Sequence, residues 1–431
     1  MILASPLALP CGAALPNRLA KAAMTEGLAD PQGLPTPELA RLYRLWSQGG
    51  AGLLISGNVQ IDADHLERPG NVIIDHELTT HERGALREWT AAGTENGNHF
   101  WAQISHAGRQ TMAAVNPHPK APSAIRLDLP GGQFGTPVAL EEHEIEAIIA
   151  GFVRAVRICR EVGFTGVQIH AAHGYLLSQF LSPRTNRRED GWGGSLENRA
   201  RLLTQIVRQA RDAVGADFPI AVKLNSADFQ KGGFAFEDSL RVVGWLEELG
   251  VDLIEISGGT YEQPRLLGIE GVEPADNPQI ALSAAPSTAA REAYFVDFAS
   301  AMKDTVGVPL MVTGGFRSRV AMEQAVESGA ADVIGLGRPL CIETDGPARL
   351  LAGAAALARY EDEITLLPRS LRFLNRVKLV RTMAGFATQF WFYAQIYALG
   401  RTGKPDRDRS VFSAWREVEA AHKEWLARRR G

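Results

Sequence analysis

An alternation of short apolar runs with longer amphipathic segments constrains this chain more than any other feature. Eight apolar runs have the length of buried strands, at residues 19–23, 52–56, 99–104, 166–170, 220–224, 253–256, 310–312 and 333–336. Helical spacing of apolar residues lies between them, most clearly at 145–162, 196–214, 238–249 and 320–327, each with a glycine within two residues of its end. Such a glycine is a common helix stop. Strands that alternate with helices predict a parallel sheet, and eight such units predict a (β/α)8 TIM barrel.

An open, doubly wound sheet is the alternative fold. That fold needs a glycine-rich turn after its first strand, and the segment from Lys21 to Thr25 contains no glycine. We therefore expect a barrel over residues 1–350, in which residues 1–17 form a short N-terminal lid over the bottom. Residues 351–431 are expected to form a C-terminal helical extension.

Composition excludes several classes of protein. The formal net charge is −4, so there is no basic field for nucleic acid. The three cysteines, Cys11, Cys159 and Cys341, form no C-x-x-C pair, which argues against an iron–sulfur cluster or a zinc ribbon. Sparse cysteine fits a reducing compartment, and the apolar N-terminus has no positive side chain before Arg18. We expect a cytoplasmic protein without a bound metal.

One segment raises the question of a membrane. The 19 residues from Thr382 to Gly400 carry no charge, which is close to the length that spans a bilayer. The segment also contains Gln389, Gln395 and an aromatic run that suits packing against protein. We therefore expect a buried or interface helix and no membrane partner. The C-terminal helices also offer a surface for a homo-oligomer or a cover for the mouth of the barrel.

Two glycine turns follow the seventh and eighth predicted strands. They contain Gly314 and Gly315 in the first turn and Gly337 and Arg338 in the second. Barrels commonly hold a phosphate on these two loops, where glycines let backbone N–H groups approach the oxygens and an arginine adds charge. Tight turns without a ligand are the alternative. The turns alone indicate a phosphate, whichever molecule carries it.

Two histidines and a tyrosine follow the fourth predicted strand. His170, His173 and Tyr175 stand at a strand end, where barrels gather catalytic groups. Paired neutral imidazoles can donate hydrogen bonds to one carbonyl oxygen, and a tyrosine can donate a proton. A zinc site is weaker, because the spacing differs from H-E-x-x-H and a third ligand is not obvious. Structural histidines are the remaining alternative.

Polar residues also stand within or after other strands. Lys223 interrupts an apolar strand and is costly there unless an anion compensates it. It predicts a Schiff-base lysine, a cation beside a reduced cofactor, or an internal ion pair. Gln103 ends the third strand and can offer both a donor and an acceptor to a ring edge. Thr25 and Gly57 are expected at the ends of the first two strands.

Together these segments resemble the old yellow enzyme family of NADH:flavin oxidoreductases over about residues 5–350. The most specific parts are Asn17-Arg18, the run from Gln103 to Arg109, and the run from His170 to Arg199. The resemblance implies an FMN cofactor. NADH or NADPH would reduce it, and hydride would pass from flavin N5 to the activated C=C bond of an α,β-unsaturated carbonyl. The expected partner is thus a small molecule with a conjugated carbonyl.

The resemblance also assigns residue roles. Thr25 matches the contact to flavin O4, Gly57 a small residue near that edge, and Gln103 the pyrimidine-ring contact. Lys223 stands where the family has a cation, often arginine, near N1 and O2. The phosphate cradle matches Gly315, Gly337 and Arg338. His170 and His173 match the pair that grips the substrate oxygen, and Tyr175 matches the proton donor.

The chain departs from the family's larger members in two ways. They carry a cysteine cluster and extra nucleotide-binding domains after the barrel, which this sequence lacks, so electrons would pass directly from NAD(P)H to FMN. The shortest members lack the C-terminal helical segment. Three other functions stay open: flavin-dependent amine oxidation or demethylation, a flavin-free lyase that uses Lys223, and a non-catalytic binding barrel.

Overall fold

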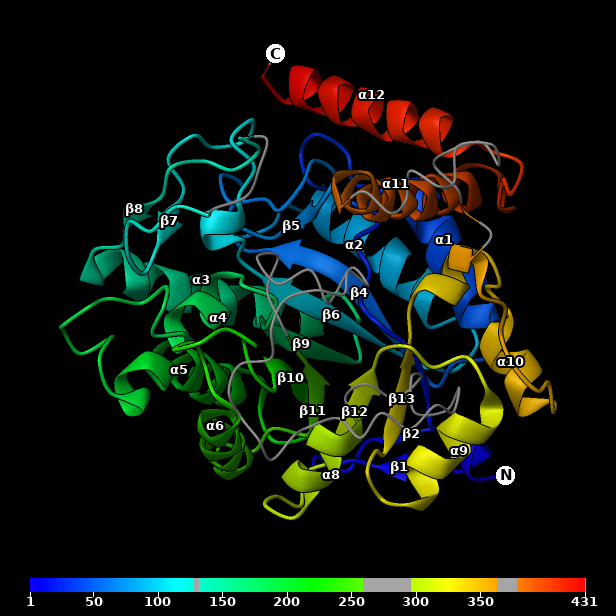
Figure 1. The fold of residues 1–431 in the computed structure, drawn as a ribbon, viewed down its shortest axis with the longest axis horizontal. Helices are drawn as coiled ribbons and strands as arrows, with labels where there is room; N and C mark the ends of the chain where they lie inside the picture. Colours follow the sequence, from blue (N-terminus) through cyan, green and yellow to red (C-terminus); the bar gives the residue numbers. More distant parts are fainter. Residues whose placement is uncertain (128–131, 259–295, 363, 365–377, 431) are drawn as a thin grey trace.

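Eight parallel strands form a closed barrel with helices around it (Figure 1). The computed structural model describes residues 1–127, 132–258, 296–362, 364 and 378–430. Strand pairing continues around the barrel until the last strand pairs with the first. In order, the strands are β3 (Leu19–Lys21), β4 (Leu53–Gln60), β6 (His99–Ser105), β9 (Gly166–Ala171), β10 (Ile220–Asn225), β11 (Leu253–Ser257), β12 (Leu310–Thr313) and β13 (Val333–Leu336). The predicted barrel is confirmed.

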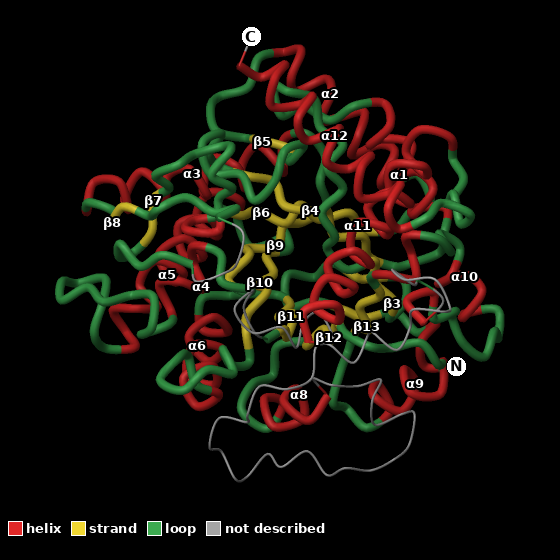
Figure 2. The backbone as a smooth tube through the Cα atoms, turned by 45° about the horizontal axis from the view of Figure 1, so that its top comes forward, coloured by secondary structure: helices red, strands yellow, loops and turns green. Residues whose placement is uncertain are grey.

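Figure 2 shows the helices as an outer layer around these strands. The helices are α1 (Pro37–Gln48), α2 (Thr80–Gly93), α3 (Glu142–Glu161), α4 (Leu176–Leu181), α5 (Leu196–Val214), α6 (Phe236–Glu248), α8 (Val296–Lys303), α9 (Arg319–Glu327), α10 (Gly346–Leu351), α11 (Lys378–Thr402) and α12 (Val411–Arg430). Local sequence sets many starts: Thr79 and Glu82 form a reciprocal capping box at α2. The Ser195 side chain caps α5 by accepting the Asn198 N–H.

A hairpin of β1 (Leu7–Ala8) and β2 (Ala14–Leu15) packs against the bottom of the barrel. Its leucines form one buried cluster with inward side chains of the strands, among them Leu53, Trp101 and Met311. Side chains alternate between the two faces of a strand, so the residue two positions later points inward one layer higher. The residues of the apolar bottom layer therefore set which later residues of each strand point inward near the mouth.

Strand β4 runs further than the sequence predicted. Gly57 was expected at the end of the second strand, but it lies inside β4, which continues to Gln60. The register between β4 and β6 shifts between Ile55 and Asn58, and beyond this irregularity β4 also pairs with β5 (Val72–Ile73). The bulge absorbs the extra residues and lets the strand continue past the glycine.

The C-terminal helices lie against the mouth side of the first barrel units (Figure 1). Helix α11 packs on α1 and α12, and Trp391, Ile396 and Tyr397 within it are buried. The uncharged segment is therefore helical and its described part is largely buried, as predicted. Among the described residues, no helix has the length and apolar content needed to cross a bilayer.

Candidate active site

A chain of polar side chains crosses the barrel directly above its apolar bottom. The Gln103 amide donates to Gln168 Oε1 at 2.6 Å, and the Gln168 amide donates to Glu255 Oε2 at 2.8 Å. Lys223 Nζ lies 2.9 Å from Glu255 Oε1, and all four residues are buried. Lys223 is therefore in an internal ion pair, one of the three possibilities its sequence position allowed. The pair balances the lysine's charge inside the barrel and fixes its position.

His170 lies next to this layer, in register with Lys223 on the neighbouring strand. Its Nδ1 accepts the Ala172 N–H at 3.2 Å, which assigns the proton of the neutral ring to Nε2. Burial, followed by the nearby His173 and Lys223, holds the pKa of His170 well below its usual range. The ring is therefore neutral near pH 7, with one N–H to donate.

His173 begins the turn after β9 in a left-handed conformation, with φ of 61°. The turn is held by its N–H, which donates to Asn225 Oδ1 at 3.1 Å, and by its carbonyl, which accepts from Gln110 at 2.7 Å. Its Nε2 lies 2.5 Å from Ser257 Oγ. Burial and the Lys223 charge hold the pKa of His173 well below its usual range. The two imidazole centroids are 5.2 Å apart.

Tyr175 completes this cluster and is 3% exposed. Its ring centroid lies 4.9 Å from that of His170, at an interplanar angle of 83°. Its hydroxyl donates to Glu67 Oε2 at 2.5 Å, and the Thr25 hydroxyl donates to the other oxygen of the same carboxylate. Thr25 and Tyr175, which are far apart in the sequence, are thus joined through Glu67, a loop residue between β4 and β5.

The long sequence runs that carry the family resemblance meet beneath this cluster. The Gln179 amide nitrogen donates to the carbonyls of Gly174 at 2.7 Å and Ala107 at 3.3 Å, and its oxygen accepts the Arg109 N–H at 3.2 Å. Gly108 has φ of 57°, and a Cβ there would lie 2.5 Å from Gln179 Oε1. One glutamine therefore ties the two runs together.

Gly57 packs against the loop that carries Thr25. Glu26 accepts the Gly57 N–H at 2.8 Å and also accepts from the Tyr43 hydroxyl. A Cβ at position 57 would lie 2.1 Å from Glu26 Oε2. Lys21 donates to the Ile55 carbonyl at 2.7 Å and lies 3.8 Å from Glu26. Burial lowers the pKa of Lys21 to about 8. This network fixes the Thr25 loop relative to β4.

The two predicted phosphate turns stand side by side after the paired strands β12 and β13. Gly314 and Gly315 have φ of 145° and 75°, values that residues with a Cβ rarely adopt. Arg338 begins a 3-10 helix (Arg338–Cys341), is exposed, and lies 3.8 Å from Glu361. Buried Arg317 lies 2.7 Å from the same carboxylate. Two cations and a glycine turn suit a phosphate group.

A separate group of Asp62, His65 and His106 lies within metal-ligand distances but is satisfied internally. Asp62 lies 2.8 Å from His65 Nδ1 and 3.7 Å from His106 Nε2. The opposite nitrogens accept backbone N–H groups, of Lys120 at 2.8 Å and Gly108 at 3.1 Å. Both imidazole lone pairs are therefore used. Burial lowers the pKa of His106 to about 4. The group is best explained as a structural network.

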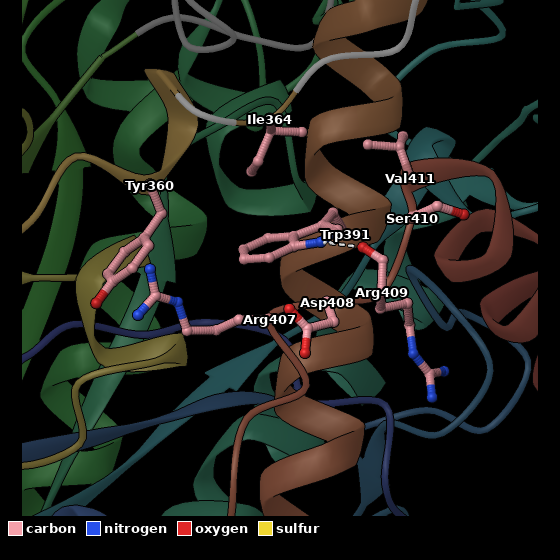
Figure 3. Close-up of a pocket in the computed structure, with 8 residues that line it drawn as sticks. All are labelled: Tyr360, Ile364, Trp391, Arg407, Asp408, Arg409, Ser410 and Val411. Carbon is pink, nitrogen blue, oxygen red and sulfur yellow. Dashed lines mark hydrogen bonds between the residues drawn. The ribbon is translucent and has the colours of Figure 1, made fainter. Parts of the chain in front are cut away.

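A cavity of about 590 Å³ lies elsewhere, beside α11 and the segment that leads into α12. Its lining includes Tyr360, Trp391 and Arg407, and Figure 3 shows the Trp391 indole bonded to the Arg409 carbonyl, at 2.8 Å. It contains none of the predicted site residues. This cavity is therefore separate from the predicted site residues.

Several residues of the cluster were missing from the sequence prediction. Glu255 and Gln168 stand at inward positions of apolar strands, the same signal that identified Lys223. Glu67, Asn225 and Ser257 contact the predicted tyrosine and histidine, and their sequence neighbourhoods carry no comparable signal. Their inward positions in apolar strands could have identified Glu255 and Gln168 from the sequence.

Comparison with known proteins adds independent information. The model of the NADH:flavin oxidoreductase / NADH oxidase family matches residues 3–355. The NADH-dependent flavin oxidoreductase iliE of Neonectria sp. (strain DH2) is 39% identical over 353 residues, covering 78% of this chain and 45% of that one. The NADH-dependent flavin oxidoreductase iccE of Talaromyces variabilis is 36% identical over 422 residues, covering 93% of this chain and 99% of the relative.

Solved structures agree with this relationship. The old yellow enzyme homologue from Zymomonas mobilis has a TM-score of 0.67 at 25% identity, over 85% of this chain and 97% of that one. Morphinone reductase has a TM-score of 0.65 at 25% identity, over 83% of this chain and 91% of that one. The chain thus belongs to the NADH:flavin oxidoreductase / NADH oxidase family and is an oxidoreductase of the old yellow enzyme type.

Proposed function

We propose that this protein uses FMN to transfer hydride from NADH or NADPH to the activated C=C bond of an α,β-unsaturated carbonyl. One observation carries the proposal: two neutral histidines, the buried His170 and the half-buried His173, stand beside the buried Tyr175 at the mouth of the barrel. Neutral imidazoles donate to an uncharged carbonyl oxygen without placing a buried charge against it. The relatives from Neonectria sp. and Talaromyces variabilis are named NADH-dependent, so NADH is the first reductant to test.

The residues present fit FMN. Thr25, Gln103 and Lys223 carry hydrogen-bond donors of the kind that a flavin ring edge needs, and in this structure they contact Glu67, Gln168 and Glu255 respectively. Gly314, Gly315, Gly337 and Arg338 would hold the phosphate. The Thr313 hydroxyl, at the start of this turn, is buried without a hydrogen-bond partner among the described residues, so a polar group can be accommodated there. FMN supplies a hydride carrier that alternates between the nicotinamide and the substrate.

The protein's own residues bind the substrate and supply the proton. His170 donates its Nε2–H to the carbonyl oxygen, and His173 approaches the same oxygen from the turn after β9. Both bonds draw electron density toward oxygen and polarise the conjugated alkene. Tyr175, next to His170, gives its hydroxyl proton to the α-carbon. Lys223 holds a fixed ammonium group beneath the site, in its ion pair with Glu255.

The test is an anaerobic cycle followed by flavin absorbance. We expect the yellow protein to bleach with NADH or NADPH, and the colour to return on addition of an enone. Amines that bleach the oxidised flavin, together with enones that fail to restore it, would instead support amine oxidation. A phenol should give a long-wavelength absorbance band. Replacing His170 and His173 with alanine should abolish it, and an unchanged band would contradict the proposed oxygen-binding pair.

A flavin-free lyase that uses Lys223 fits the structure less well. A Schiff-base lysine reacts as the neutral amine, whereas Lys223 is paired with the buried Glu255 carboxylate. Purified protein that is colourless, takes up no flavin and is trapped by borohydride with a carbonyl substrate would favour the lyase. Assembly through the C-terminal helices stays a prediction, for which light scattering on the purified protein is the direct measurement.

A further inference from the structure

We propose that Glu67 is a proton relay for Tyr175, refilling its hydroxyl from solvent each time the tyrosine protonates a substrate. This inference rests on the proposed function, in which Tyr175 is the proton donor. Glu67 acts through the tyrosine and need not touch the substrate itself.

The first support is the contact between the two side chains. The Tyr175 hydroxyl donates to Glu67 Oε2 at 2.5 Å. The phenol is 3% exposed, whereas Glu67 is only half-buried. Glu67 therefore stands between the buried phenol and solvent. Its other oxygen accepts from Thr25 and lies 3.4 Å from the Asn71 amide, which holds the carboxylate in place.

The second support is electrostatic. If Tyr175 alone gave up its proton, a buried phenolate would stand next to the Glu67 carboxylate. Burial and a like charge both oppose that state. The arrangement favours a coupled transfer in which Glu67 has first taken up H⁺ from bulk solvent. The Tyr175 O–H bond then breaks as the α-carbon C–H bond forms, and the Glu67 carboxylic acid gives its proton to the phenol oxygen. The carboxylate left behind takes up the next H⁺ from bulk solvent, so one solvent proton enters per C=C bond reduced.

Thr25 links this relay to the predicted flavin contact. A threonine hydroxyl has one proton, so Thr25 cannot donate to Glu67 and to a flavin oxygen at the same time. When the hydroxyl turns to a flavin, Glu67 Oε1 loses a donor and becomes available to hold a proton. The residue that contacts the cofactor therefore also influences whether the relay is loaded.

The central test is Glu67→Gln, which keeps the size of the side chain and an oxygen for the tyrosine hydroxyl but removes the transferable proton. We expect reduction of the flavin by NADH and the phenol band to be unchanged. Reoxidation by an enone should slow at least tenfold, with an altered pH profile, because proton transfer by a positioned group contributes ~10²–10⁴-fold. Asp64 is an exposed carboxylate in the same loop, so Asp64→Asn is the matched control and should not change the rate of reoxidation.

A double variant separates a relay from an independent role. In a Tyr175→Phe background, Glu67→Gln should slow reoxidation no further, because the relay has lost the group it serves. Slowing by the product of the two single effects would overturn the proposal. Glu67→Asp, which keeps a carboxylic acid, should retain more activity than Glu67→Gln. The reverse order would equally contradict a relay, and this comparison remains available if Glu67→Gln folds poorly.

A measurement without substrate distinguishes this inference from the proposed function. In flavin-free protein with ring-labelled tyrosine, the NMR signal assigned by Tyr175→Phe should titrate at lower pH in Glu67→Gln, because the neighbouring negative charge is gone. An identical titration of Tyr175 in the wild-type protein and in Glu67→Gln would show that Glu67 does not contact the tyrosine hydroxyl, and the relay depends on that contact. Wild-type protein that reduces no enone while the titration shifts would overturn the ene-reductase proposal and the relay's role in it, but not the contact.

Discussion

The ammonium of Lys223 lies 2.9 Å from a carboxylate oxygen of Glu255 inside the barrel, where both side chains are buried. The second carboxylate oxygen of Glu255 is held by Gln168. A buried pair of this kind can contribute little net stability as a whole, but the loss of one partner leaves the other charge unpaired.

Lys223→Met should therefore destabilise the flavin-free protein strongly, by about 3–5 kcal/mol, because Glu255 would remain buried without a counter-charge. Urea unfolding followed by circular dichroism measures the loss. Arg241→Ala, which breaks an exposed pair with Glu197, should have a far smaller effect. Recovery of stability in a Lys223→Met, Glu255→Leu double variant would confirm that the unpaired carboxylate causes the loss. A loss of stability in Arg241→Ala as large as that in Lys223→Met would contradict this explanation.

The histidines at the mouth predict a loss of stability toward acid. An unfolded histidine binds a proton near pH ~6.5, whereas burial holds the pKa of folded His170 and His173 well below that value. Between the two pKa values the unfolded chain binds more protons, so unfolding becomes easier as the pH falls from about 7 to about 5. The slope is up to ~1.4 kcal/mol per pH unit for each histidine.

Urea midpoints across this pH range test the prediction. His170→Asn with His173→Asn should reduce the slope, while buried His106, whose pKa is lowered to about 4, should keep part of it. His76 is exposed, and its hydrogen bond to Asp75 raises its pKa, so His76→Asn should not reduce the slope. An unchanged slope in the double variant would show that the mouth histidines do not contribute.

Gly57→Ala should weaken both stability and flavin retention. The added Cβ would lie 2.1 Å from Glu26 Oε2 and 2.6 Å from the Met24 carbonyl, so the loop that carries Thr25 must move. Gly244→Ala is the matched control, because this helical glycine in α6 has no heavy atom within 4 Å of the added Cβ. It should raise stability by up to ~1 kcal/mol. Thermal unfolding and flavin fluorescence measure both effects, and a neutral Gly57→Ala would refute the steric explanation.

Trp425→Ala should release α12 from the barrel. The indole N–H of Trp425 is 3.0 Å from the Ala29 carbonyl and 2.9 Å from the Asp30 carbonyl, and the ring packs with Leu66 and Ile73. Truncating a buried tryptophan costs about 3–5 kcal/mol, so we expect faster hydrogen exchange and proteolysis within α12. Trp415→Ala, on the same helix but 41% exposed, should leave both unchanged. Equal protection in the two variants would contradict the anchoring role.

The barrel was predictable because a strand buried on both faces must be apolar along its length, and the eight apolar runs show this directly. The extent of β4 was not predictable, because it depends on a bulge opposite β6 and on pairing with β5. Lys223 and Gln103 were identified as polar residues in apolar strands. Glu255 is likewise a polar residue in an apolar strand, and it is the ion-pair partner of Lys223. Glu67 lies in a loop, so only the folded chain brings it to Tyr175.

The position of the C-terminal helices was likewise beyond the sequence. The lack of charge in residues 382–400 indicated a buried helix, and α11 contains it. Its docking on α1, and the contact of Trp425 with the loop after β3, are pairings between distant segments. Helical periodicity gives a helix its apolar face but does not name the surface that covers it.

The anchoring of α12 also determines the order in which this molecule can be completed. Arg429 donates to the Pro31 carbonyl at 2.7 Å, and Arg430 donates to the Ala114 carbonyl at 2.7 Å. These acceptors leave the ribosome about 300 to 400 residues before their donors. The loops around Glu67 therefore stay uncovered by α12 through most of translation. A nascent chain that stalls before α12 would expose the rim of a nearly complete barrel.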